Sequence, residues 1–141
     1  MKVKIIIILF TISMLLSCNG NDENIQKSII RDKLQQIQIS FLQRDLDKLM
    51  SFYHPEFYHK GNDINAMANI WQHRMNIFLE LDIEVMDIEV RSEYAIAILK
   101  IVFKDANTTY PPYIDHETEG DLSYFYHDHR DWNIIGNEMP E

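Results

Sequence analysis

Hydrophobic residues recur at three- and four-residue steps in two parts of the chain, which is the spacing of an amphipathic helix. The first part starts after Asn24, a residue that can cap a helix, and continues to Phe52–His54, because Pro55 disfavours helical geometry at the preceding residue. Its apolar positions are Ile25, Ile29, Ile30, Leu34, Ile37, Phe41, Leu42, Leu46 and Leu49. This pattern predicts one long helix lying on a hydrophobic core.

The second helical pattern follows the turn residues Gly61-Asn62-Asp63, and Asp63 or Asn65 can cap it. Its apolar face is formed by Met67, Ile70, Trp71, Ile77, Phe78 and Leu81. Between the two helices, Phe57 to Lys60 is a short aromatic segment that is typical of a strand.

From Asp82 onward the apolar residues alternate with polar ones, and this period of two predicts strands. The first strand covers Ile83 to Val90, with a slip at Met86-Asp87 that indicates a β-bulge. The second, Tyr94 to Phe103, is apolar on both faces except at Lys100, which predicts a central strand covered on both sides.

The last part of the chain contains two more predicted strands, Leu122–Tyr126 and Trp132–Ile135, after a predicted loop at Asp105–Pro112. Helix, short strand, helix and antiparallel meander together predict an α+β fold, in which helices cover one face of a curved sheet.

The N-terminal segment has the layout of a secretory signal. Lys2 and Lys4 precede the apolar run Ile5–Leu16, whose 12 residues are fewer than the roughly 20 that cross a bilayer as a helix. The sequence Leu15-Leu16-Ser17-Cys18 then resembles a bacterial lipobox, in which the cysteine receives a lipid and becomes the first residue. The alternatives are that Cys18 is an ordinary residue beside an ordinary cleavage site, or that the run is a buried helix.

These features predict three segments: a lipoprotein-type signal peptide over residues 1–17, the lipidated Cys18 with a polar tether over residues 18–23, and a single domain over residues 24–141. We expect the protein in the bacterial cell envelope, attached to a membrane through the lipid on Cys18, with its domain outside the cytoplasm.

Charge and cysteine content exclude some partners. The formal net charge is −9 and becomes more negative without Lys2 and Lys4, and such a field repels phosphate backbones, so nucleic acid is not an expected partner. Because Cys18 is the only cysteine, neither an intramolecular disulfide nor a cysteine-ligated zinc site is possible.

The order of elements resembles the nuclear transport factor 2-like superfamily, in particular its SnoaL-like and ketosteroid-isomerase-like bacterial members. The similar motifs are the helix end Arg44–Leu49 with the proline turn Tyr53–Phe57, Ile70-Trp71 in the second helix, the strand Ile83–Val90, and the closing strand Trp132–Ile135 after a polar turn. The resemblance covers nearly all of residues 18–141. It implies a nuclear transport factor 2-like or cystatin-like fold, in which the sheet curls into a cone around a pocket used for catalysis, ligand binding or partner contacts.

The aromatic residues suit such a pocket, because their apolar rings carry polar tips. We therefore predict that ligand binding involves Tyr53, Tyr58, Trp71, Tyr94, Tyr124 and Tyr126. An isomerase-like member needs a carboxylate base beside hydrogen-bond donors in an apolar site. The nearest equivalents are His59 or Asp63 as the base and Tyr58 or Tyr53 as the donor, and no matching second carboxyl is evident in the later strands.

Two polar clusters are further candidates. In Asp115-His116-Glu117, carboxylates beside a histidine could bind a metal or transfer protons. Neighbouring side chains of a strand would point to opposite faces and could not converge on one ion without a turn, so a solvated loop is expected. His127 and His129 would share a face of a continued strand and could bind a metal with Asp131 or His116. The five consecutive polar residues 127–131 are more typical of a hairpin turn, so we expect no metal there and both histidines facing water.

The sequence thus supports three hypotheses. The first is an envelope lipoprotein whose domain binds a small apolar or amphipathic ligand, or a protein partner, without a cofactor and without catalysis. The second is a SnoaL-like acid/base enzyme, of isomerase, cyclase or hydrolase type, acting on a small cyclic substrate in the same pocket. The third is a structural module that forms a homodimer through its exposed sheet face.

Overall fold

The computed structural model describes residues 3–115 and 120–137, with side chains described from Asp22 onward. Helix α1 (Val3–Leu42) is continuous over 40 residues, so it begins far upstream of the start predicted at Asn24. The segment before Asn24 contains no proline, and a helix that has formed gains one hydrogen bond with each residue added. Residues 18–23, predicted as a tether, are therefore helical, whereas cleavage and lipidation stay predictions.

The end of α1 also differs from the prediction, because the helix stops at Leu42 instead of continuing to the proline turn. Arg44 adopts a left-handed φ of 60°, a conformation that closes helix C-termini. Asp45 then caps the short helix α2 (Leu46–Met50), and its carboxylate accepts the Lys48 N–H at 2.9 Å. Leu49 still faces the core after this break, so the apolar spacing alone does not reveal it.

A small hairpin of β1 (Tyr58–His59) and β2 (Asn62–Asp63) leads into helix α3 (Ile64–Ile77). Asp63 caps α3 by accepting the Ala66 N–H at 2.8 Å, which confirms one of the two predicted caps. The buried residues Met67, Trp71 and Met75 are spaced by four, so one face of α3 packs on the core.

The described residues form a five-stranded antiparallel sheet from β3 (Glu80–Arg91), β4 (Tyr94–Lys104), β5 (Tyr113–Asp115), β6 (Tyr124–His127) and β7 (Trp132–Ile134). The order is β3-β4-β6-β7, and β5 pairs with the part of β4 beyond β6. The bulge lies between Val85 and Asp87, where the sequence predicts it. Strand β5 was not predicted, because three residues are too few to show alternation.

The two faces of β4 have different environments. Its inner face is buried and consists of Ala95, Ala97, Leu99, Ile101 and Phe103. On the outer face Tyr94 and Ile98 are 38% and 37% exposed. The prediction that this strand is covered on both sides is therefore wrong for the part of the chain that the structure describes.

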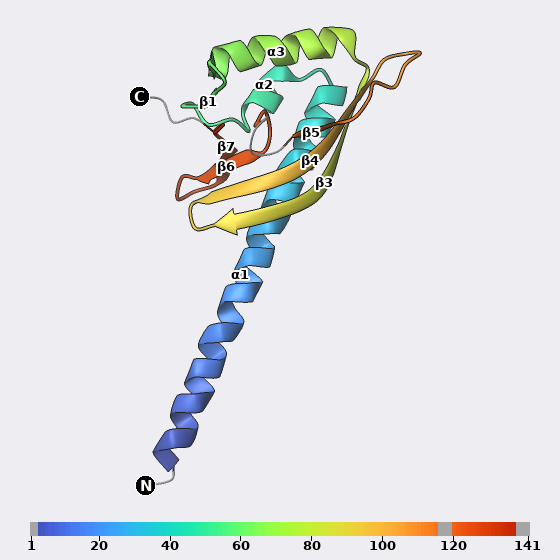
Figure 1. Ribbon diagram of the computed structural model, residues 1–141. Coiled ribbons are helices and arrows are strands. Elements are labelled where there is room, and N and C mark those ends of the chain that lie inside the picture. The colour runs from blue at the N-terminus through green and yellow to red at the C-terminus, as the bar shows by residue number, and fades with distance from the viewer. Residues whose placement is uncertain (1–2, 116–119, 138–141) are drawn as a thin grey trace.

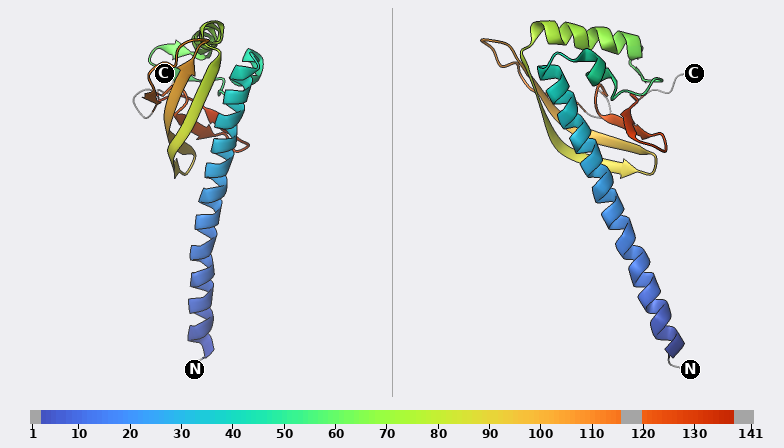
Figure 2. Two further views of the ribbon diagram at one scale, coloured as in Figure 1. Left: turned by 90° about the vertical axis from the view of Figure 1, so that its right-hand side faces the viewer. Right: turned by 180° about the vertical axis from the view of Figure 1, so that it is seen from behind.

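Helix α1 lies along the inner face of the sheet, and α3 closes one end of it (Figure 1). The first half of α1 projects from the opposite end of the domain (Figure 2). The core between helices and sheet is formed by residues such as Ile30, Ile37, Phe41, Leu81 and Ile88, which are at most 1% exposed. No helix within the part of the chain whose side chains are described is long and apolar enough to cross a lipid bilayer.

Candidate functional site

Tyr53 and Trp71, two of the predicted pocket residues, meet in the core beneath α3. The Trp71 indole N–H donates to the Tyr53 hydroxyl at 2.7 Å, and that hydroxyl donates to the Asp121 carbonyl at 2.9 Å. Burial is the main reason why the pKa of Tyr53 lies well above its ordinary value. The polar tips of both side chains are thus bonded within the protein, and they connect α3 to the chain before β6.

An ion pair lies next to this hydrogen-bonded pair. The Arg74 guanidinium contacts the Asp121 carboxylate at 2.7 Å and lies over the rings of Trp71 and Phe103, at 4.7 and 5.5 Å from their centroids. Its Nη1 is buried without a hydrogen-bond partner among the described residues. Arg74 therefore holds α3 against β4 and the Asp121 loop.

Asp115 is a buried carboxyl on the inner face of β5, contrary to the expectation of a solvated loop. It accepts the backbone N–H groups of Leu122 and Asp121 at 2.7 and 3.2 Å. Burial raises its pKa to about 6, although these N–H groups act in the opposite direction. His116 and Glu117, its neighbours in the predicted cluster, lie outside the described residues.

The sequence points to Asp115 only as part of a polar cluster, for which a solvated loop is expected, so the burial of this carboxyl was missed. A carboxyl with a raised pKa is a recognised sign of acid/base chemistry. One feature of the sequence could have indicated the burial of Asp115: it lies two residues after Tyr113, so in a strand both side chains point to the same face. The neighbouring polar residues are more typical of a loop.

The two weak catalytic candidates lie in the β1–β2 hairpin. His59 is 1% exposed, and its Nδ1 is hydrogen-bonded to Asn137 Oδ1. Its ring packs so closely on Gly120 that a Cβ at Gly120 would lie 2.5 Å from His59 Cε1. No hydrogen bond between described residues joins His59 to Tyr58, whose own side chain is half-buried. The third candidate, Asp63, is the cap of α3.

The remaining predicted binding residues lie on the outer face of the sheet. In the β4–β6 register Tyr94 is opposite Tyr126 and Ile96 is opposite Tyr124, and the residues between them point to the core. The Tyr94 and Tyr126 rings are 5.2 Å apart, and His54 packs on Tyr126 at 5.7 Å. The sheet therefore separates Tyr94, Tyr124 and Tyr126 from Tyr53 and Trp71, and these five residues cannot line one cavity.

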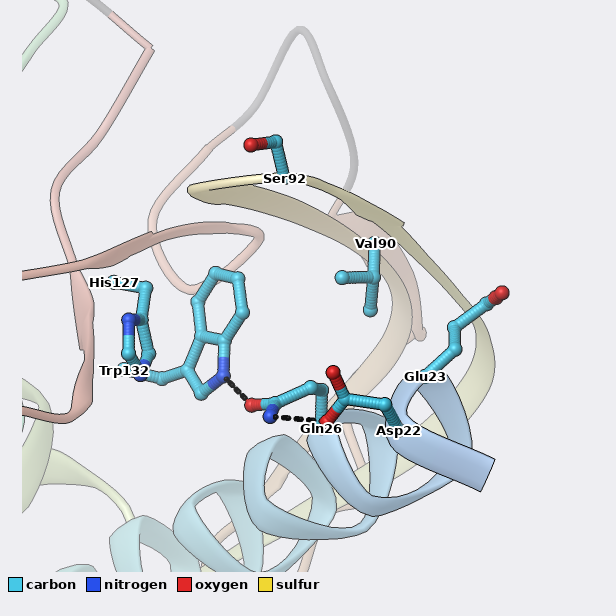
Figure 3. Close-up of a pocket in the computed structure, with 7 residues that line it drawn as sticks. All are labelled: Asp22, Glu23, Gln26, Val90, Ser92, His127 and Trp132. Carbon is cyan, nitrogen blue, oxygen red and sulfur yellow. Dashed lines mark hydrogen bonds between the residues drawn. The ribbon is translucent and has the colours of Figure 1, made fainter. Parts of the chain in front are cut away.

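A pocket of about 400 Å³ lies where α1 leaves the domain (Figure 3). It is lined by Asp22, Glu23 and Gln26 of α1, Val90 of β3, Ser92 of the turn after β3, His127 of β6 and Trp132 of β7. This volume is within the range of small-molecule sites.

The pocket involves the histidine-rich stretch, although in a different way from the metal hypothesis. His127 is half-buried and packs on Trp132 with ring centroids 5.0 Å apart. His129 is exposed in the β6–β7 turn with a left-handed φ of 68°, and the Asp128 carboxylate accepts two N–H groups of that turn. The predicted hairpin turn is confirmed, and of the two histidines His129 is exposed whereas His127 is only partly accessible. No group of three potential metal ligands occurs among the described residues.

Two hydrogen bonds and one ion pair stabilise the α1 side of the pocket. The Trp132 indole N–H donates to Gln26 Oε1 at 2.6 Å, and the Gln26 amide donates to Asp22 Oδ1 at 3.2 Å. Lys27 pairs with Glu23 at 2.7 Å. The pocket is therefore built across four segments, which only the folded chain brings together.

Comparison with solved structures identifies the fold. No family model and no curated protein matches the chain in sequence. An NTF-2 like protein of unknown function from Shewanella oneidensis MR-1 is similar in structure, with a TM-score of 0.62 and 16% identity over 77% of this chain and 93% of that one. A domain of unknown function with a cystatin-like fold from Nostoc punctiforme has a TM-score of 0.55 and 16% identity, covering 79% and 74% of the two chains.

A third similar structure, from Thiobacillus denitrificans, is described as an association domain of the calcium/calmodulin-dependent protein kinase type II kind. Its TM-score is 0.57 with 13% identity, over 73% of this chain and 86% of that one. These likenesses show that the chain has the nuclear transport factor 2-like, or cystatin-like, fold: an α+β domain with N-terminal helices on an open antiparallel sheet.

Proposed function

We propose that this protein is a lipid-anchored binding protein of the bacterial cell envelope, whose domain takes a small amphipathic ligand in the pocket between α1 and the end of the sheet. The observation that carries this proposal is the pocket itself, lined by both polar and apolar side chains. The lipobox-like sequence ending at Cys18 lies four residues before Asp22 in the same helix, which is about 6 Å along its axis. A lipid on Cys18 would place the pocket close to the membrane surface.

The interior contacts favour binding over catalysis. The hydroxyl of Tyr53, the indole N–H of Trp71 and the carboxylate of Asp121 are all bonded to other protein groups. His59 is packed against Gly120 and Asn137. A catalytic acid or base must reach a substrate, and these groups are arranged to stabilise the fold.

The alternative is a SnoaL-like acid/base enzyme, and one observation favours it. The pKa of Asp115 is about 6 because of burial, which suits a general acid or base near neutral pH. The carboxyl is fully buried and accepts two backbone N–H groups, so it would need a rearrangement of the Asp121–Leu122 backbone to meet a substrate.

Thermal unfolding of the full chain in dodecyl maltoside tests the binding proposal. Short-chain alcohols, amines and carboxylates should include compounds that raise Tm by a few °C when in large excess over Kd. Val90→Phe, which fills the pocket, should abolish this rise, whereas Val102→Phe, a change of the same size on the outer face of β4, should keep it. An equal rise in both variants would place the ligand elsewhere.

A second candidate function is self-association through the outer face of the sheet. This surface combines Tyr94, Ile96, Ile98, Ile114, Tyr124 and Tyr126 from three neighbouring strands. Apolar residues gathered in this way on a sheet face are typical of interaction sites. The similar structure described as an association domain supports a second copy of the chain as the occupant.

A further inference from the structure

The pocket between α1 and the sheet has an unequal charge distribution. Glu23 is neutralised by Lys27, and Asp131, in the β6–β7 turn, is neutralised by Lys33 at 2.6 Å. Asp22 has no ion-pair partner among the described residues, and its carboxylate accepts a hydrogen bond from the neutral amide of Gln26. Within the part of the chain whose side chains are described, one carboxylate at the pocket is therefore not balanced by a cation.

The orientation of that carboxylate is set by a chain of hydrogen bonds. Trp132 donates to Gln26, which donates to one oxygen of Asp22. Figure 3 shows the other oxygen of Asp22 pointing toward the space between the Trp132 indole and Val90. A bound group would meet an anionic oxygen on one side and apolar atoms on the other.

We infer that the pocket binds the cationic head of a small amphipathic amine, with a primary or quaternary ammonium group beside Asp22 and its carbon atoms against Val90 and the edge of Trp132. An ammonium ion gains attraction from the carboxylate, and its apolar substituents are removed from water. An anionic head of the same size would be repelled by Asp22. This inference rests on the proposed ligand-binding function and adds the chemical class of the ligand.

The two tryptophans of the chain provide separate reporters. Trp132 lines the pocket, whereas Trp71 is fully buried under α3 and bonded to Tyr53. In the full chain labelled with 5-fluorotryptophan, held in dodecyl maltoside, each gives its own ¹⁹F resonance, and Trp132→Phe assigns them. If Trp132→Phe does not fold, Gln26→Ala provides a second assignment, because Gln26→Ala removes the hydrogen-bond acceptor of the Trp132 indole.

Benzyltrimethylammonium is the probe, with benzyl alcohol and benzylsulfonate as neutral and anionic analogues. The cation should shift the Trp132 resonance in a saturable way and leave the Trp71 resonance in place. Asp22→Asn, which keeps the size and removes the charge, should weaken binding roughly three- to fivefold, the upper range for an exposed ion pair. Asp32→Asn, an exposed acid elsewhere on α1, should leave the affinity unchanged.

Three results would overturn the inference. If the neutral and anionic analogues shift Trp132 as strongly as the cation, the pocket binds without charge selection, and the proposed binding function stands alone. If Asp22→Asn binds like the unaltered chain, the counter-ion is not Asp22. If no probe moves the Trp132 resonance, the pocket takes no such amine, and the proposed function is then judged by its thermal and anchoring tests.

Discussion

At the scale of single residues, two glycines with the same backbone conformation differ in their surroundings. Gly136 has φ 82°, and a Cβ there would lie 2.3 Å from the carbonyl oxygen of Tyr58. Gly61 has φ 78°, but nothing lies within 4 Å of its Cβ position. The first glycine is required by both conformation and close packing, and the second by conformation alone.

Gly136→Ala should therefore destabilise the domain by roughly 1–3 kcal/mol, because the carbonyl of Tyr58 is backbone and cannot move aside without disturbing the β1–β2 hairpin. Gly61→Ala should lower the free energy of unfolding by only about 1 kcal/mol, because it affects the backbone conformation alone. The free energies of unfolding in urea measure both. Equal losses would show that the contact at Tyr58 contributes nothing.

Asp115 predicts a pH dependence of stability. Its folded-state pKa of about 6 lies above the ordinary value of 3.8, so the folded protein binds the proton more tightly than the unfolded chain. Its contribution to stability is thus greatest at acidic pH and decreases as the pH rises from about 4 to about 6. Asp115→Asn should remove this decrease, a difference of up to about 3 kcal/mol between pH 4 and pH 7.

Urea unfolding at a series of pH values measures this effect as the difference between the unaltered chain and the variant. Asp32→Asn, an exposed acid on α1, is the control and should keep the pH profile of the unaltered chain. An Asp115→Asn profile that runs parallel to the unaltered one across this pH range would contradict a raised pKa in the folded state.

At the scale of elements, β4 determines what each side of the sheet can do. Its small residues Ala95 and Ala97 face the core, and its outer face exposes Ile98 in a row with Tyr94 and Ile96. The lysines further along this face are paired with acids of β3, for example Lys100 with Glu84 at 2.9 Å. The apolar end of β4 is thus the part available to a second copy.

If this face forms a dimer, Ile98→Glu should shift the protein to monomer in analytical ultracentrifugation, because two buried carboxylates would be desolvated across a symmetric interface. Ile77→Glu is the matched control, since Ile77 is a comparably exposed isoleucine on α3, away from the sheet face. Sedimentation that is the same for both variants and for the unaltered chain would remove this candidate function.

At the scale of the whole molecule, α1 joins the domain to its proposed anchor. The helix is packed against the sheet in its second half and projects from the domain in its first half (Figure 2). Because residues 18–23 are helical rather than a loose tether, the orientation of the domain at the membrane would follow the direction of this helix. The pocket would then lie at a fixed distance along the helix from the lipid on Cys18.

Cys18→Ser tests the anchor. Without a thiol no lipid can be attached, so the protein should lose membrane association after fractionation of bacterial cells, and incorporation of labelled palmitate should disappear. Ser28→Cys in the Cys18→Ser background is the control, because a thiol elsewhere on α1 should not restore lipidation. Membrane association and palmitate labelling that persist in Cys18→Ser would refute the lipoprotein assignment.

The sequence alone was sufficient for the α+β class, the cap at Asp63, the bulge near Met86 and the hairpin turn at residues 127–131. Each of these depends on side-chain period, capping chemistry or turn preference within a few neighbouring residues, so it can be predicted from the local sequence. The break between α1 and α2 could not be predicted in this way, because Leu49 continues the apolar spacing of α1 beyond the break.

Tertiary structure alone decided which residues share a site. Alternation shows that Tyr94, Tyr124 and Tyr126 share a face, but it cannot show which face is covered. The burial of Asp115 depends on Leu122 and Asp121 folding back over it. The pocket joins Asp22 to Trp132, more than a hundred residues away, through Gln26. Such long-range contacts follow from packing of the whole chain, which no local pattern encodes.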